Sequence, residues 1–119
     1  MPSRGRILIV DDEESVRLLA RRVLERAGFS VGEADDGPVA ITTFAADPDA
    51  WFGVLLDVTL PTLDGLTVLD QMTQIRPSLL VVLTSGWTEE EVSERVGGRH
   101  LVRFLQKPYR AESLAEAFS

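Results

Sequence analysis

A single carboxylate, Asp57, stands where a short apolar segment gives way to a turn. Residues 54–56 form a continuous apolar run, which is typical of a strand buried on both faces of a parallel sheet. Pro61 then bars regular structure, and Asp64-Gly65 is a turn dipeptide. The sequence therefore predicts an acid at the carboxyl end of a central strand, where open α/β sheets place their chemistry. A carboxylate in that position can act as a nucleophile and accept a phosphoryl group.

Three other apolar runs also stop at or beside polar residues that could take part in such a reaction. The runs at 7–10, 79–83 and 101–105 are followed by these side chains: Asp11, Asp12, Thr84 and Lys107. In a parallel sheet all carboxyl ends lie on one edge. We therefore expect these residues to be neighbours of Asp57 in space, although they are far apart along the chain.

Three acids, a lysine and a threonine form a set with a definite chemistry. Carboxylates crowded together repel one another, and burial increases that cost. A hard divalent cation removes the conflict, and Mg²⁺ prefers a few carboxylates together with water and phosphate oxygens. The ammonium of Lys107 and the hydroxyl of Thr84 can bind phosphate oxygens, so the set would stabilise the charge that spreads over a transferring phosphoryl group. Ser85 is small and leaves room for that group.

Alternating strands and helices must bring these residues together. The apolar patterns predict strands at 7–10, 29–34, 53–57, 79–83 and 101–105, and helices at 13–27, 38–46, 66–76, 89–96 and 111–118. Strand and helix alternate five times with short connections. That order predicts an α/β fold with a parallel sheet covered by helices on both faces. The fourth helix is polar, with Val92 and Val96 as its main apolar residues.

Composition limits the class of protein further. The chain has 119 residues, of which 45% are hydrophobic, and this fits one domain with a real core. Its net charge of −7 argues against a nucleic-acid partner. It has no cysteine, no apolar stretch of membrane-spanning length and no signal peptide, so we expect a cytoplasmic protein without membrane contact. We expect a monomer or a weak dimer.

With these motifs in place, the chain resembles the response-regulator receiver domain of two-component phosphorelays, over residues 1–119. The matching segments are Val10-Asp11-Asp12, Leu56-Asp57 with Pro61 and Asp64-Gly65, Thr84-Ser85-Gly86 and Lys107-Pro108. The resemblance implies a flavodoxin-like (βα)5 three-layer sandwich with a five-stranded parallel sheet of order 2-1-3-4-5. It also implies Mg²⁺ as cofactor, and a histidine kinase or histidine phosphotransfer protein as partner.

The resemblance assigns roles to the residues of the acidic cluster. Asp57 would accept the phosphoryl group and would also be a metal ligand, and Asp12 would bind Mg²⁺ directly. Asp11 would act mostly through water, and the backbone carbonyl of Thr59 would be a further ligand. Such a domain catalyses its own phosphorylation and slow hydrolysis and is not a metabolic enzyme.

The resemblance also implies a switch. Lys107 and Thr84 would contact the phosphoryl oxygens, and the bond between Lys107 and Pro108 would be cis. After phosphorylation Thr84 would be drawn toward the phosphoryl group, and Phe104 would turn inward to fill the space. The loop at 84–88 and the fourth helix would then change their surface. Packing in or near the core is an equally simple role for Phe104.

Some features of the chain bear on its context. The region from Thr84 to Tyr109 is most similar to receivers of hybrid histidine kinases. The fifth helix looks cut short at Ser119, so the chain is either excised from a longer protein or a lean stand-alone response regulator. Thr59 and Gly86, at positions where side chains tune the lifetime of the acyl phosphate, are neither acids nor amides, and we predict no lifetime from them.

Other classes fit the residues less well. A phosphatase of the aspartyl-nucleophile type usually carries a second acid two residues after the nucleophile, and Thr59 occupies that position. A flavodoxin-like cofactor binder needs a phosphate loop after the first strand, where Asp11 and Asp12 would repel phosphate. A receiver-like module that never meets phosphate would not need the full set of residues.

Three side-chain sets outside the cluster have simpler interpretations. Four arginines of the first helix form a solvated face, which could also dock a helical phosphodonor domain: Arg17, Arg21, Arg22 and Arg26. His100 is predicted to lie in an exposed loop and to be neither phosphodonor nor ligand. Trp87 is predicted to cover a strand edge, and it could report on metal or phosphate by its fluorescence.

Overall fold

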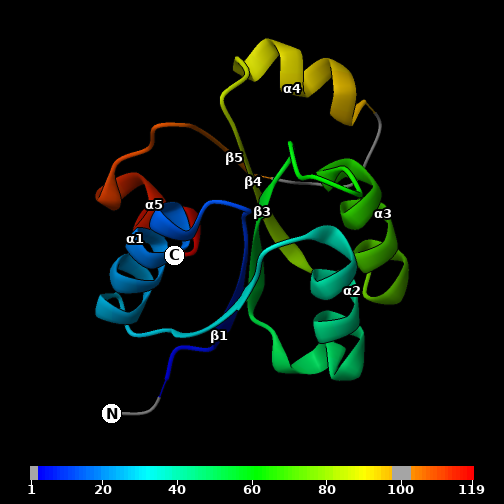
Figure 1. Ribbon diagram of the computed structural model, residues 1–119. Helices are drawn as coiled ribbons and strands as arrows, with labels where there is room; N and C mark the ends of the chain where they lie inside the picture. The colour runs from blue at the N-terminus through cyan, green and yellow to red at the C-terminus, as the bar shows by residue number, and fades with distance from the viewer. Residues whose placement is uncertain (1–2, 98–102) are drawn as a thin grey trace.

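Five parallel strands form one sheet at the centre of the computed structural model, which describes residues 3–97 and 103–119 (Figure 1). The strands are β1 Arg6–Val10, β2 Ser30–Ala34, β3 Gly53–Asp57, β4 Leu80–Ser85 and β5 Arg103–Gln106. Their order is β2-β1-β3-β4-β5. The predicted flavodoxin-like fold and its strand order 2-1-3-4-5 are therefore confirmed.

The helices follow the strands in the predicted alternation. They are α1 Glu14–Arg26, α2 Gly37–Ala46, α3 Gly65–Ile75, α4 Glu89–Val96 and α5 Ala111–Ala117, and a short 3-10 turn, η1, spans Pro48–Ala50. This turn was not predicted. The expected start of the last strand at Leu101 and the loop position of His100 lie outside the described residues.

Helices lie on both faces of the sheet (Figure 1), and the buried side chains form two separate cores, one on each face. Strand β1 shows how this arises, since successive side chains of a strand point to opposite faces. Ile7 and Ile9 pack with α1 and α5, whereas Leu8 and Val10 pack with α2, α3 and α4. All five residues of β3 are buried, as expected for a central strand covered on both faces. The two cores hold the carboxyl edge of the sheet in a fixed position.

Side-chain caps fix where several helices begin at that edge. Asp36 accepts a hydrogen bond from the backbone N–H of Val39 at the start of α2. Asp64 does the same at the start of α3, and Thr88 forms a capping box with Glu91 at the start of α4. Each cap satisfies backbone donors that the first turn leaves free. The turn dipeptide Asp64-Gly65 thus ends a loop and starts a helix.

Several helix residues depart from simple periodicity. Leu19 follows the apolar spacing of α1, but it is 54% exposed and lines a groove of about 530 Å³ between α1 and α5. Val39 and Ile75 are apolar but exposed, and they lie in the first turn of α2 and the last turn of α3. Arg17, expected in solvent, is turned toward β1 and β2, and only 16% of its side chain is exposed.

Among the described residues, no helix combines the length and apolarity needed to cross a membrane.

Candidate functional site

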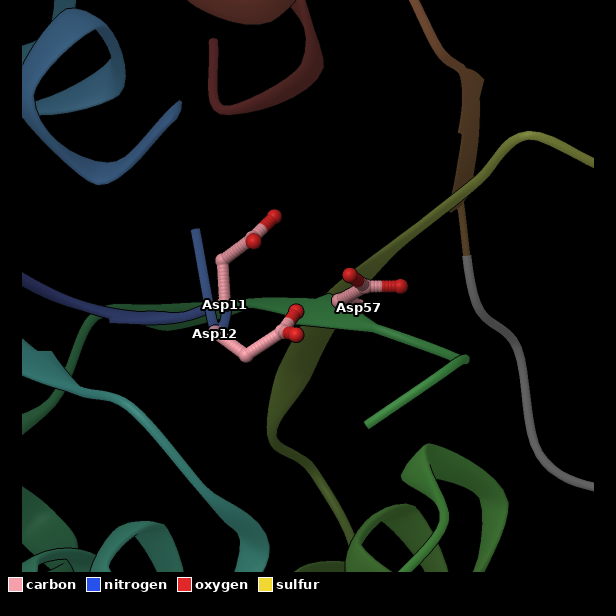
Figure 2. A group of neighbouring side chains, drawn as sticks. All are labelled: Asp11, Asp12 and Asp57. Atoms are coloured by element: carbon pink, nitrogen blue, oxygen red, sulfur yellow. The ribbon is translucent and has the colours of Figure 1, made fainter. Parts of the chain in front are cut away.

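The carboxyl ends of β1, β3, β4 and β5 meet as the sequence predicted, and they bring the chemical residues together. Strand register places Asp57 of β3 directly beside Thr84 of β4. The backbone N–H of Lys107 donates to the carbonyl of Ser85 at 2.7 Å, which fixes the residue after β5 against the end of β4. Figure 2 shows the side chains of Asp11, Asp12 and Asp57 gathered at the ends of β1 and β3.

Lys107 bridges two of the three acids. Its Nζ donates to Asp11 Oδ2 at 2.7 Å and to Asp57 Oδ2 at 2.9 Å. Burial acts to lower the pKa of Lys107, but the two carboxylate partners outweigh burial and raise the pKa above its ordinary value. The lysine is therefore charged at neutral pH. It places a positive charge between two carboxylates that are almost completely buried.

Asp57 is held by its neighbours as well as by Lys107. The backbone N–H of Thr59 donates to Asp57 Oδ1 at 2.9 Å, and the Thr59 hydroxyl donates to the same oxygen at 3.0 Å. The side chain of Asp57 is only 3% exposed. The carboxylate of Asp57 therefore has a fixed orientation at the end of β3. A fixed orientation favours reaction of this carboxylate with a group that approaches from one direction.

The three acids fit a hard divalent cation. One carboxylate oxygen from each of Asp11, Asp12 and Asp57 lies within 4.8 Å of the others. Asp12 is exposed, whereas Asp11 is buried. Burial raises the pKa of Asp11, although hydrogen bonds from Lys107 and from the N–H of Glu13 act in the opposite direction. Two buried acids and one exposed acid, all oxygen donors, form a set suited to Mg²⁺ that keeps several waters.

The predicted switch residues Thr84 and Phe104 lie on the neighbouring strands β4 and β5, and Thr84 is paired with Asp57 in the sheet. Thr84 is 2% exposed, and Ser85 is completely buried and accepts a hydrogen bond from the N–H of Trp87. Phe104 is half-buried and packs against the core on the α2–α4 side of the sheet. Trp87 packs against the same core and lies under the guanidinium of Arg95, 4.1 Å from the ring centroid. Both aromatic rings therefore adjoin the segment that begins at Thr84.

Three features of the site were missed in the sequence. The N–H of Glu13 donates to Asp11 Oδ1 at 2.9 Å, as a favoured short-range turn allows. Burial, with a smaller contribution from the negative charges of Asp11 and Asp57, raises the pKa of Tyr109 to about 12. Arg17 donates to the backbone carbonyl of Asp11. No signal in the sequence distinguishes Arg17 from the other arginines of α1. The cis bond between Lys107 and Pro108 was predicted and is present.

The fold and the site together define a flavodoxin-like α/β domain with an acidic pocket and a bridging lysine at the carboxyl edge of its sheet. The sequence profile of the response regulator receiver domain matches residues 7–119. The chain belongs to this family of two-component signalling domains.

Individual relatives agree with this assignment. The chain is 43% identical over 113 residues to the response regulator MprA of Mycolicibacterium vanbaalenii, which covers 92% of this chain and 46% of that protein. The chain thus spans about half the length of such curated relatives. The receiver domain of the hybrid histidine kinase CckA is 33% identical, with a TM-score of 0.78 and 94% coverage of both chains. A receiver domain protein from Clostridium thermocellum has the same fold, with a TM-score of 0.88, 24% identity and coverage of 96% of this chain and 90% of that one.

Proposed function

We propose that Asp57 accepts a phosphoryl group from a phosphohistidine of a partner protein. An oxygen of the Asp57 carboxylate forms a bond to phosphorus, the N–P bond of the phosphohistidine breaks, and the imidazole nitrogen leaves with the electron pair. The observation that carries this proposal is the bridge of Lys107 between Asp11 and Asp57. It places a fixed cation beside a buried, oriented carboxylate, where charge on a transferring phosphoryl group needs stabilisation.

The residues around Asp57 have separate tasks in this reaction. Asp11, Asp12, Asp57 and the backbone carbonyl of Thr59 would hold Mg²⁺, which supplies positive charge to the phosphoryl oxygens when bound. Lys107 releases one carboxylate partner and pairs with a phosphoryl oxygen. The hydroxyl of Thr84 donates to another. Water later hydrolyses the acyl phosphate, which releases inorganic phosphate and restores the Asp57 carboxylate; this is the role of a signalling domain and not of a metabolic enzyme.

The response would arise where β4 leads into α4. Phosphorylation adds a charge of about −1.5 to −2 beside Thr84. If the Thr84 hydroxyl moves toward that charge, the half-buried ring of Phe104 can occupy the space it leaves. Helix α4 contributes only Val92 and Val96 to the core, so this helix can move at low energetic cost. The surface around α4 and β5 would then differ between the two states.

The phosphodonor would be a histidine kinase or a histidine phosphotransfer protein. Helix α1 exposes Leu18 and Leu19 on its surface, near Arg22 and Arg26, which also line the groove against α5. An apolar patch with a basic rim suits an amphipathic helix as partner. The similarity to hybrid histidine kinase receivers and to response regulators supports both contexts, and origin from a hybrid kinase stays a prediction.

Removal of the metal is expected to stop phosphorylation. Acetyl phosphate with Mg²⁺ should add one phosphoryl group to the intact protein, and EDTA should prevent it, because the acidic pocket needs a cation to admit phosphate. Asp12→Asn removes one anionic ligand and is expected to weaken Mg²⁺ binding about 10- to 100-fold. Calorimetric titration with Mg²⁺ measures this. The matched control is Glu14→Gln, an exposed acid two residues further on. Unchanged affinity in Asp12→Asn would remove its role as a ligand.

Lys107→Ala is expected to separate phosphorylation from response. The rate of labelling by acetyl phosphate should fall on the order of 10²-fold, the usual effect of losing one charge-stabilising donor. Mg²⁺ should bind more tightly, because the variant lacks the ammonium that occupies Asp11 and Asp57. The change in amide chemical shifts on beryllofluoride binding should be reduced. Arg110→Ala, an exposed cation nearby, serves as control. A full spectral change in Lys107→Ala contradicts the role of Lys107 in the response.

A further inference from the structure

Arg17 of α1 contacts the acidic pocket through a hydrogen bond to the backbone of Asp11. Its Nη1 donates to the carbonyl of Asp11 at 2.7 Å, and its Nε donates to Glu33 Oε1 at 3.1 Å. Only 16% of its side chain is exposed. The guanidinium is planar, so two partners at these distances fix its orientation. One side chain therefore joins α1, strand β2 and the turn that carries Asp11 and Asp12.

The carbonyl of Asp11 belongs to the peptide unit that leads into Asp12. The rest of Asp11 is also held: its N–H donates to the carbonyl of Ala34 at 3.2 Å, and its two carboxylate oxygens accept from Glu13 and Lys107. The hydrogen bond from Arg17 to the carbonyl of Asp11 completes these contacts, so every polar group of Asp11 has a partner. Since a peptide unit is planar, fixing the carbonyl of Asp11 also fixes the N–H and the Cα of Asp12.

We infer that Arg17 is a positioning residue for the magnesium site: by holding the Asp11 carbonyl, it directs the exposed carboxylate of Asp12 toward Asp57. This inference depends on the proposed function of the acidic pocket. Asp12 is the exposed member of the three acids, so its direction depends most on the backbone beneath it. Partners that orient metal ligands commonly affect metal affinity about 10- to 100-fold.

Glu33 makes this arrangement compatible with binding a cation. A lone guanidinium near the pocket would repel Mg²⁺, but Glu33 pairs with Arg17 and offsets its charge. The contribution of Arg17 is therefore one of direction and not of net charge. Arg21 provides the comparison that the chain itself offers. Its Nε donates to Glu33 Oε2 at 2.7 Å, and its Nη1 to Glu25, so it pairs with the same acid without reaching the turn.

The test compares Arg17→Lys with Arg21→Lys in the full chain. Lysine retains the charge and most of the stem but cannot hold two partners in a fixed plane. Arg17→Lys is expected to weaken Mg²⁺ binding, measured by calorimetric titration, about 10-fold or more. It should also shift the Asp12 backbone amide signal in the metal-free protein. Arg21→Lys should leave both readouts unchanged. Urea denaturation of each variant measures the loss of stability separately.

Two outcomes overturn this inference, and a third overturns the proposed function instead. Normal Mg²⁺ affinity in Arg17→Lys overturns the inference and leaves the proposed function intact. Equal losses of affinity in Arg17→Lys and Arg21→Lys also overturn it, since both then act through Glu33 and general stability. Failure of the unaltered protein to bind Mg²⁺ overturns the proposed function. In that case an unshifted Asp12 amide in Arg17→Lys would further show that Arg17 does not set the turn.

Discussion

Asp57→Asn is expected to abolish phosphorylation of this protein by acetyl phosphate and by a histidine phosphodonor. An amide has the shape of the carboxylate but lacks its negative charge, and a neutral amide oxygen is too weak a nucleophile to attack phosphorus. Its oxygen can still accept the two hydrogen bonds from Thr59. Its NH2 group, however, cannot accept from Lys107 at the position of Oδ2. The variant should fold, because asparagine has nearly the same size, while it loses the acceptor group completely.

Mass spectrometry of the intact protein and of its peptides checks this prediction. The unaltered chain should gain one phosphoryl group on the peptide that contains Asp57, and Asp57→Asn should gain none. Asp35→Asn is a matched control, because Asp35 is an exposed acid directly after β2 at the same edge of the sheet. Labelling of Asp57→Asn at the rate of the unaltered chain would refute the assignment of the acceptor.

Gly65→Ala is expected to give the largest loss of stability among single methyl additions near the site. A Cβ atom at this position would lie 2.3 Å from the carbonyl oxygen of Asp57 and 2.6 Å from the Cα of Val58. Both atoms belong to backbone that cannot move aside without shifting the end of β3. The close approach also allows the N–H of Gly65 to donate to the carbonyl of Val58 at 2.8 Å. We expect the free energy of unfolding to fall by about 3 kcal/mol, the upper part of the usual range for overpacking.

Urea denaturation measures that loss, and Gly86→Ala provides the control. Gly86 lies one residue after the end of β4, and a Cβ atom there would have no neighbour within 4 Å. Gly86→Ala should therefore change the free energy of unfolding by less than about 0.5 kcal/mol. Phosphorylation of Gly65→Ala should also slow, because the displaced backbone carries Asp57. Equal stabilities of the two variants would contradict the close packing of α3 against β3.

The strand ends were the most predictable part of the site. Apolar runs locate buried strands, and parallel strands share one carboxyl edge, so Asp57 and Thr84 could be placed side by side before their register was known. The same reasoning placed Asp11 and Lys107 near each other. The residue types also predicted a phosphoryl-transfer chemistry for this set, with Asp57 as acceptor and a divalent cation beside it. The separate metal-binding tasks of Asp11, Asp12 and Thr59 came from resemblance to a family.

The helix surfaces were less predictable, because periodicity alone does not show where a neighbouring helix ends. Leu19 follows the apolar spacing of α1 but faces the groove beside α5. Arg17 follows the polar spacing but turns inward to Asp11 and Glu33. Long side chains such as arginine can bury their stems and reach partners on other elements, and those partners depend on the tertiary arrangement.

The separation of the interior into two cores has a consequence for how such a domain can diversify. No buried side chain belongs to both cores among the described residues: Leu24 and Leu114 lie on one side of the sheet, and Val68 and Val92 lie on the other. Substitutions in layers without shared partners tend to have additive effects. Substitutions on the α1 and α5 side could therefore adapt the domain to a different phosphodonor, if that side binds it as proposed, without disturbing the packing of α4 and Phe104 on the opposite side.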